Sequence, residues 1–299
     1  MAEFKLNGVG VALVTPFKDD LSPDFESLEN VIDHIIEGGC DYIVALGTTA
    51  ETPTLSIEEK ILLTDFIREK TTGRVRLIIG IGGNNTKEVI QDILNRNLNG
   101  YSAILSVTPF YNKPTQEGLF QHYKAIADNS PLPIILYNVP GRTGVNLSDK
   151  TTLRLADYSE KFIGIKEASG NLEQCKNIAE RVRNNFTLIS GDDGIIEPLM
   201  RIGAKGVISV LANALPWEVK KITSLCNKGK FKEAAELQTE LKNLTRLLFE
   251  EGNPAGIKAV LSDMGLIKNY LRLPLVRVSQ SVEEKLSFEV TKFQKVQIK

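Results

Sequence analysis

Short apolar runs rich in β-branched residues recur along the first two thirds of the chain, roughly 20 to 35 residues apart. This is the spacing that a strand followed by a crossover helix requires. Strict alternation of eight strands with helices favours an α/β fold in the form of a closed (β/α)8 TIM barrel over an open sheet. The eight predicted strands are Val9–Val14, Tyr42–Leu46, Arg76–Ile81, Ala103–Val107, Pro133–Tyr137, Phe162–Ile165, Thr187–Ile189 and Gly206–Val210.

Amphipathic stretches separate these runs and predict the helices of the barrel. Several begin with residue types that favour helix N-caps, and we predict caps at Ser56, Thr86 and Ser148. Four of the predicted helices are Asp24–Glu37, Ser56–Lys70, Thr86–Asn97 and Thr115–Asp128.

The pattern changes after the eighth run, where helical periodicity continues without a further strand. We therefore predict a catalytic barrel over residues 1–224 and a C-terminal helical appendix over residues 225–299. The predicted helical stretches here are Pro216–Asn227, Lys230–Glu250, Pro254–Met264 and a charged tail, Ser279–Lys299.

The charge balance excludes some partners. The chain of 299 residues carries 36 basic and 37 acidic side chains, which gives no electrostatic footprint for nucleic acid or for an anionic membrane. The start Met1–Lys5 lacks the apolar core of a signal peptide, and no apolar run approaches about 18 residues. We expect a cytoplasmic protein.

Cysteine and histidine usage narrows the chemistry. Cys40, Cys175 and Cys226 are widely scattered and suggest neither a disulfide framework nor a CxxC metal site. With two histidines, His34 and His122, both in helix-like stretches, a zinc site or a histidine triad is not favoured. Proton transfer would then fall to Tyr, Lys, Thr, Asp or Glu.

Lys166 ends the apolar run Phe162–Ile165, where an ammonium group is costly unless it is paired or gives up its proton. One interpretation is a side chain that extends into solvent at a strand end. The other is a nucleophile, because a desolvated amine can attack a carbonyl and form a Schiff base.

Polar side chains follow six of the predicted strands, and in a barrel those strand ends meet at one mouth, where active sites form. They are Thr48 and Thr49, Asn84 and Asn85, Tyr111, Tyr137 and Arg142, Lys166, and Asp192 and Asp193. Each also has a structural interpretation. The threonines could cap a helix, the tyrosines could be rim or turn residues, and Arg142 could belong to a solvated ion pair.

Three segments carry a family resemblance: the threonine pair Thr48–Thr49, Tyr137-Asn-Val-Pro-Gly-Arg-Thr143 and Gly164-Ile-Lys-Glu167. With them the chain resembles the dihydrodipicolinate synthase family, pyruvate-dependent Schiff-base aldolases and lyases that include N-acetylneuraminate lyase. The resemblance runs from Gly8 to about Pro274. It implies condensation of pyruvate, held as a lysine Schiff base, with L-aspartate 4-semialdehyde in diaminopimelate and lysine biosynthesis. The alternative is another class I aldolase, such as N-acetylneuraminate lyase or a keto-deoxy-sugar aldolase.

The resemblance also implies roles for single residues. Lys166 would form the imine with pyruvate, and Tyr137, Thr48 and Tyr111 would relay protons, with Tyr111 reaching in from a neighbouring subunit. A phenol ordinarily ionises near about pH 10, so Tyr137 would need such a relay. Substrate binding would fall to Thr49 for the pyruvate carboxylate, Arg142 for the aldehyde's carboxylate, and the carbonyls of Gly191 and Ile208. The implied assembly is a homotetramer, a dimer of dimers.

Many members of the family are inhibited by lysine, and the matching positions are only partly retained. Asn84, Glu88 and Thr52 could serve such a site, whereas Ile57, Lys60 and Phe110 depart from the sensitive pattern. Because Lys60 adds a positive charge where a cationic ligand would bind, we expect weak or absent inhibition by lysine. Asp192-Asp193 has no further ligands nearby in the sequence, and imine chemistry needs no metal, so we expect neither a metal nor a cofactor.

Overall fold

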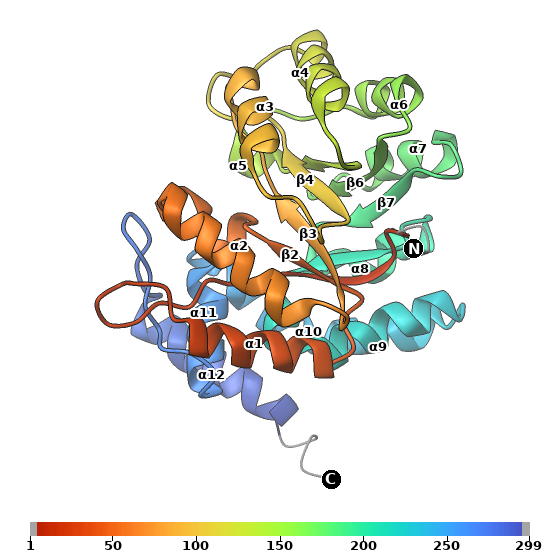
Figure 1. Ribbon diagram of the computed structural model, residues 1–299. Coiled ribbons are helices and arrows are strands. Elements are labelled where there is room, and N and C mark those ends of the chain that lie inside the picture. The colour runs from red at the N-terminus through yellow and green to blue at the C-terminus, as the bar shows by residue number, and fades with distance from the viewer. Residues whose placement is uncertain (1–4, 295–299) are drawn as a thin grey trace.

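Eight parallel strands close into a barrel in the computed structural model, which describes residues 5–294 (Figure 1). Each predicted run overlaps a strand, so the expected (β/α)8 architecture is confirmed. The strands are β1 (Gly8–Ala12), β2 (Tyr42–Ala45), β3 (Arg76–Gly80), β4 (Ala103–Val107), β5 (Ile134–Asn138), β6 (Phe162–Glu167), β7 (Thr187–Ser190) and β8 (Gly206–Ser209).

Closure follows from the pairing of β1 with both β2 and β8. The register across β5, β6 and β7 places Tyr137 opposite Lys166, and Lys166 opposite Ile189. Because they are paired, these three residues are direct neighbours across adjacent strands. One apolar cluster, which includes Val44 and Ile208, fills the barrel, and a larger one packs between the strands and the helices.

The helices surround the strands, and most begin at a capped residue. Ser56 and Ser148 are N-caps as predicted, and Ser56 forms a full capping box with Glu59. The predicted cap at Thr86 is wrong, because Asn85 accepts a hydrogen bond from the amide of Lys87 and caps this helix instead. The barrel helices are α1 (Phe25–Glu37), α2 (Ile57–Thr71), α3 (Thr86–Asn95), α4 (Gln116–Asn129), the short α5 (Pro140–Thr143), α6 (Asp149–Tyr158), α7 (Leu172–Arg181), α8 (Ile196–Arg201) and α9 (Pro216–Asn227).

Three further helices follow: α10 (Phe231–Glu250), α11 (Ala255–Asp263) and α12 (Gln280–Gln294). They pack against one another, and α10 also contacts α8 and α9 (Figure 1). The division proposed between residues 224 and 225 falls inside α9, which contacts β1 and β8. The predicted tail helix extends to residue 299, and its residues 295–299 lie outside the described part of the chain. Residues 1–4, at the start of the segment that we assessed for a signal peptide, also lie outside it.

Within residues 5–294, no helix is both long enough and apolar enough to cross a membrane. Cys175 and Cys226 are buried and Cys40 is half-buried, all three as free thiols.

His122 links two barrel helices from a buried position. Its Nδ1 atom lies 2.8 Å from the hydroxyl of Thr86. Thr86 therefore does not cap α3 but joins α3 to α4 through this contact. Burial lowers the pKa of His122 to about 4. The unfolded chain, with a histidine pKa of about 6.5, therefore binds the proton more tightly than the folded protein.

This difference predicts acid destabilisation between about pH 6.5 and pH 4. The contribution of His122 to stability is fully present above that window, and we expect a loss of about 3 kcal/mol across it. Urea unfolding as a function of pH measures it. His122→Gln should flatten the slope, whereas the control His34→Gln should retain it. Equal slopes in the wild type and in His122→Gln would contradict the assignment.

Candidate active site

A cavity of about 550 Å³ opens at the carboxyl ends of the barrel strands. Four of the predicted catalytic and substrate-binding residues line it: Thr48 after β2, Tyr137 on β5, Arg142 in α5 and Lys166 on β6. The structure therefore brings together side chains that lie up to 118 positions apart in the sequence, from position 48 to position 166. The predicted residues Thr49, Tyr111, Gly191 and Ile208 do not line this cavity in the single chain.

Lys166 is 5% exposed and lines the cavity. Its Nζ lies 4.3 Å from the centre of the Tyr137 ring, whose π face attracts a cation. Among the described residues, no carboxylate forms an ion pair with Lys166 and no acceptor takes a hydrogen bond from it. A buried amine without a counter-ion is the state from which nucleophilic attack on a carbonyl is easiest.

Gly191, which follows β7, leaves room for this lysine. A Cβ atom built there would lie 3.0 Å from both Cγ and Cε of Lys166 and 2.9 Å from Cβ of Ala168. Any side chain at 191 would thus push on the lysine. Ile208 is buried in the apolar cluster inside the barrel.

The predicted proton relay is not complete within one chain. Thr48 begins a short 3-10 helix, Thr48–Ala50, and Tyr137 is 7% exposed. Tyr111 is 88% exposed and has a φ of 72°, a backbone conformation that is uncommon outside glycine. Within residues 5–294 of one chain, no hydrogen bond joins the hydroxyls of these three residues.

The C-terminal region reaches into the cavity, which the sequence did not predict. Asn253 and Pro254 line it, as do Pro274 and Leu275. Nη2 of Arg142 donates a hydrogen bond to the carbonyl of Asn253 (3.3 Å), and Nδ2 of Asn253 donates one to Oγ1 of Thr49 (3.0 Å). The first bond joins residues that are 111 positions apart in the sequence, and the second joins residues that are 204 positions apart. Contacts at such separations leave no local sequence pattern.

A buried ion pair fastens this region to the loop after β2. The Glu51 carboxylate accepts a hydrogen bond from Nζ of Lys258 and another from the backbone amide of Arg272 (3.0 Å). Both side chains of the pair have no solvent exposure. The sequence feature that could have indicated this ion pair is Lys258 itself, which lies within the apolar stretch Ala255–Leu261. Lys166 likewise lies at the end of an apolar strand.

Of the three residues proposed for a regulatory site, one lines the cavity and two do not. Thr52 lines it, as do Lys60 and Phe110, which depart from the lysine-sensitive pattern. Asn84 and Glu88 are exposed and lie outside it. The expectation of weak lysine inhibition stays a prediction, which a lysine titration of the activity tests.

Asp192 and Asp193 have structural partners. Asp192 caps a short 3-10 helix, and Oδ2 of Asp193 accepts hydrogen bonds from the amides of Val210 and Leu211. Burial raises the pKa of the Asp193 carboxyl. Among residues 5–294, no cluster of three or more His, Cys, Asp and Glu side chains is arranged to hold a metal ion.

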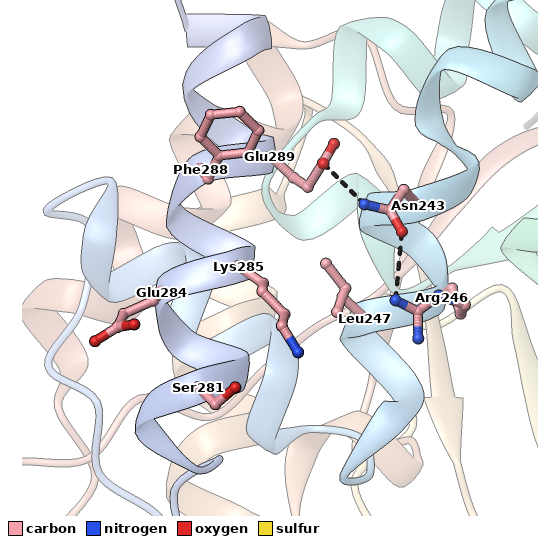
Figure 2. A pocket seen from close by; sticks show the side chains of 8 residues that line it. All are labelled: Asn243, Arg246, Leu247, Ser281, Glu284, Lys285, Phe288 and Glu289. Carbon is pink, nitrogen blue, oxygen red and sulfur yellow. Dashed lines mark hydrogen bonds between the residues drawn. The ribbon is translucent and has the colours of Figure 1, made fainter.

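A second, smaller groove of about 280 Å³ lies between α10 and α12 (Figure 2). A hydrogen bond from Asn243 on α10 to Glu289 on α12 crosses it, Arg246 of α10 donates to Asn243, and half of the lining side chains are charged. None of the strand-end residues lies there, so the buried Lys166 identifies the barrel cavity as the candidate site. Fold and cavity together define a (β/α)8-barrel enzyme built around a buried lysine.

Comparison with known proteins narrows this class. A profile of the dihydrodipicolinate synthetase family matches residues 5–293. Relatives from Parabacteroides distasonis and Phocaeicola vulgatus, both named 4-hydroxy-tetrahydrodipicolinate synthase, are 49% identical over 286 residues, which is 96% of this chain and of each relative. The solved dihydrodipicolinate synthase from Aquifex aeolicus is 38% identical with a TM-score of 0.93, covering 97% of this chain and 98% of that one. The chain belongs to the dihydrodipicolinate synthetase family.

Proposed function

We propose that the protein catalyses the 4-hydroxy-tetrahydrodipicolinate synthase reaction, in which pyruvate and L-aspartate 4-semialdehyde condense to the cyclic product and one water. The amine of Lys166 attacks the keto carbon of pyruvate, and water leaves to give the imine. Loss of a methyl proton gives the enamine, whose carbon attacks the aldehyde carbon. The substrate's own amino group then displaces the lysine from the imine carbon, which closes the ring and frees the enzyme.

The observation that carries this proposal is the unpaired, buried amine of Lys166 in the cavity. Tyr137 is paired with Lys166 in the strand register and its ring lies beside the amine, which supports it as the candidate to exchange protons with the imine nitrogen and the departing water. Thr48 lines the same cavity and is the candidate for the next hydroxyl of the relay. Thr49 is the candidate for the pyruvate carboxylate through its backbone amide and hydroxyl.

Arg142 favours this substrate over a sugar. A guanidinium can bind a carboxylate through two parallel hydrogen bonds, and Arg142 lies on the cavity with no carboxylate partner among residues 5–294. The aspartate-derived aldehyde carries such a carboxylate at the opposite end of its four-carbon chain from the reacting aldehyde carbon. The names of the curated relatives support the same choice over N-acetylneuraminate lyase, and their bacterial biosynthetic role supports a cytoplasmic location.

We further propose that the chain forms a homotetramer, a dimer of dimers, in which Tyr111 completes the partner's site. Its 88% exposure supports this, as do exposed apolar side chains on the loop after β4 and on helices α2 and α3. Family membership alone does not settle the assembly, since one solved neighbour is described as a monomeric variant. The exposed apolar side chains are Ile57, Ile61, Leu62, Leu94, Phe110 and Tyr111.

Borohydride reduction in the presence of pyruvate tests the chemistry. We expect a mass increase of one reduced pyruvate adduct on Lys166, detected by peptide mass spectrometry, and its loss in Lys166→Met. The matched control is Lys161→Met, which removes a lysine directly before the same strand and should keep the adduct. A folded wild-type protein with Lys166 unmodified would overturn the proposed function.

Co-expression tests the shared site. Tyr111→Phe and Lys166→Met should each lose activity, and a mixed dimer should regain it, because one of its two sites would hold both wild-type residues. Sedimentation velocity on the same samples reports the assembly. No recovery in a sample shown to contain mixed dimers would contradict the placement of Tyr111 in the partner's site.

A further inference from the structure

Asn253 connects two predicted binding residues that come from different parts of the barrel. Its carbonyl accepts a hydrogen bond from Nη2 of Arg142, and its side-chain amide donates to the hydroxyl of Thr49. It is 6% exposed and lines the cavity. One residue of the C-terminal region thus contacts both a candidate ligand of the aldehyde and a candidate ligand of pyruvate.

The side chain of Asn253 fixes where its carbonyl lies. Asn253 follows Gly252, whose φ of 104° is open to glycine and strained for other residues, and it precedes Pro254. Gly252 is held by backbone hydrogen bonds with Phe249 and Gly256. In the described part of the chain, the backbone N–H of Asn253 has no hydrogen-bond acceptor, so the bond from its side chain to Thr49 is the one that ties Asn253 itself to the loop after β2. On the C-terminal side, α11 holds the segment through Lys258 and Glu51.

Arg142 depends on that carbonyl for its orientation. It lies on α5, a helix of four residues, and its side chain is long and exposed at the mouth. Within residues 5–294, the carbonyl of Asn253 is the acceptor that its guanidinium contacts. An arginine side chain without such a partner samples several rotamers, because fixing it in one costs about 2 kcal/mol of rotamer entropy.

We propose that Asn253 is a positioning residue that orients the guanidinium of Arg142 to bind the carboxylate of the aldehyde substrate, and that the C-terminal region is in this way part of the active site. The inference rests on the proposed function and deepens it. Asn253 acts through Arg142, whereas formation of the pyruvate imine at Lys166 does not require that guanidinium.

Steady-state kinetics of Asn253→Ala test this. We expect the KM for L-aspartate 4-semialdehyde to rise about five- to tenfold, the range that the loss of one hydrogen bond supports. At saturating pyruvate the borohydride-trapped adduct at Lys166 should still form, because the substitution leaves the hydroxyl and the backbone amide of Thr49 in the protein. In an Arg142→Lys background, Asn253→Ala should add little, because the group that it orients is already altered.

Asn269 offers a matched control. It is a second buried asparagine of the C-terminal region, 7% exposed, with Nδ2 bound to Glu283 and, like Asn253, with a buried Oδ1 atom that has no partner in the described structure. Asn269→Ala should lower the melting temperature comparably and leave the KM for the aldehyde unchanged. If Asn253→Ala does not fold, Asn253→Ser, whose shorter side chain also fails to reach Thr49, should give the same rise in KM.

The outcomes separate the two proposals. No pyruvate adduct on the wild-type protein would overturn the proposed function and this inference with it. A normal adduct in Asn253→Ala with an unchanged KM for the aldehyde would overturn the inference alone. An equal rise in the KM for the aldehyde in Asn269→Ala would also overturn the inference, and so would full additivity of the Asn253 and Arg142 substitutions. Either result would show that the effect of Asn253→Ala is structural and does not depend on the guanidinium of Arg142.

Discussion

A carboxylate and an ammonium group, both without solvent exposure, join the loop after β2 to α11 through the contact between Glu51 and Lys258. Burial lowers the pKa of Lys258 to about 8 and Glu51 opposes the shift, so the amine stays mostly charged at neutral pH. Glu51 also binds the amide of Arg272, and Lys258 also donates to the carbonyl of Tyr270. These bonds hold the two C-terminal segments that line the cavity against the loop that carries the threonine pair.

Two lysines are buried among residues 5–294, and they differ in what surrounds the amine. Lys258 has a carboxylate and a carbonyl as partners, which makes it a structural group. Lys166 faces a cavity and an aromatic ring, and no carboxylate pairs with it in the described part of the chain. Burial alone therefore does not distinguish a nucleophile from an anchor; the presence or absence of a counter-ion does.

Most of the fold could be predicted from the sequence because strands buried on both faces leave continuous apolar runs. Strand-end residues such as Lys166 and Tyr137 could also be placed, since the carboxyl ends of barrel strands converge. Asn253 could not, because its partners lie more than 100 positions away and hydrogen bonds at that separation impose no periodicity. The cap at Asn85 was missed because Asn85 and Thr86 are adjacent and both residue types can cap a helix. In the structure the hydroxyl of Thr86 contacts His122, and Asn85 is the cap.

The most direct test of this account is the free energy of unfolding of Lys258→Met, Glu51→Gln and the double variant. Leaving one buried charge unpaired should cost Lys258→Met about 3–5 kcal/mol, and the double variant should recover most of it. The control Lys176→Met, which removes an exposed ion pair with Glu180, should cost less than about 1 kcal/mol. If Lys258→Met were as stable as the wild type, or the double variant no more stable than Lys258→Met, the pair would not anchor the C-terminal region to the site.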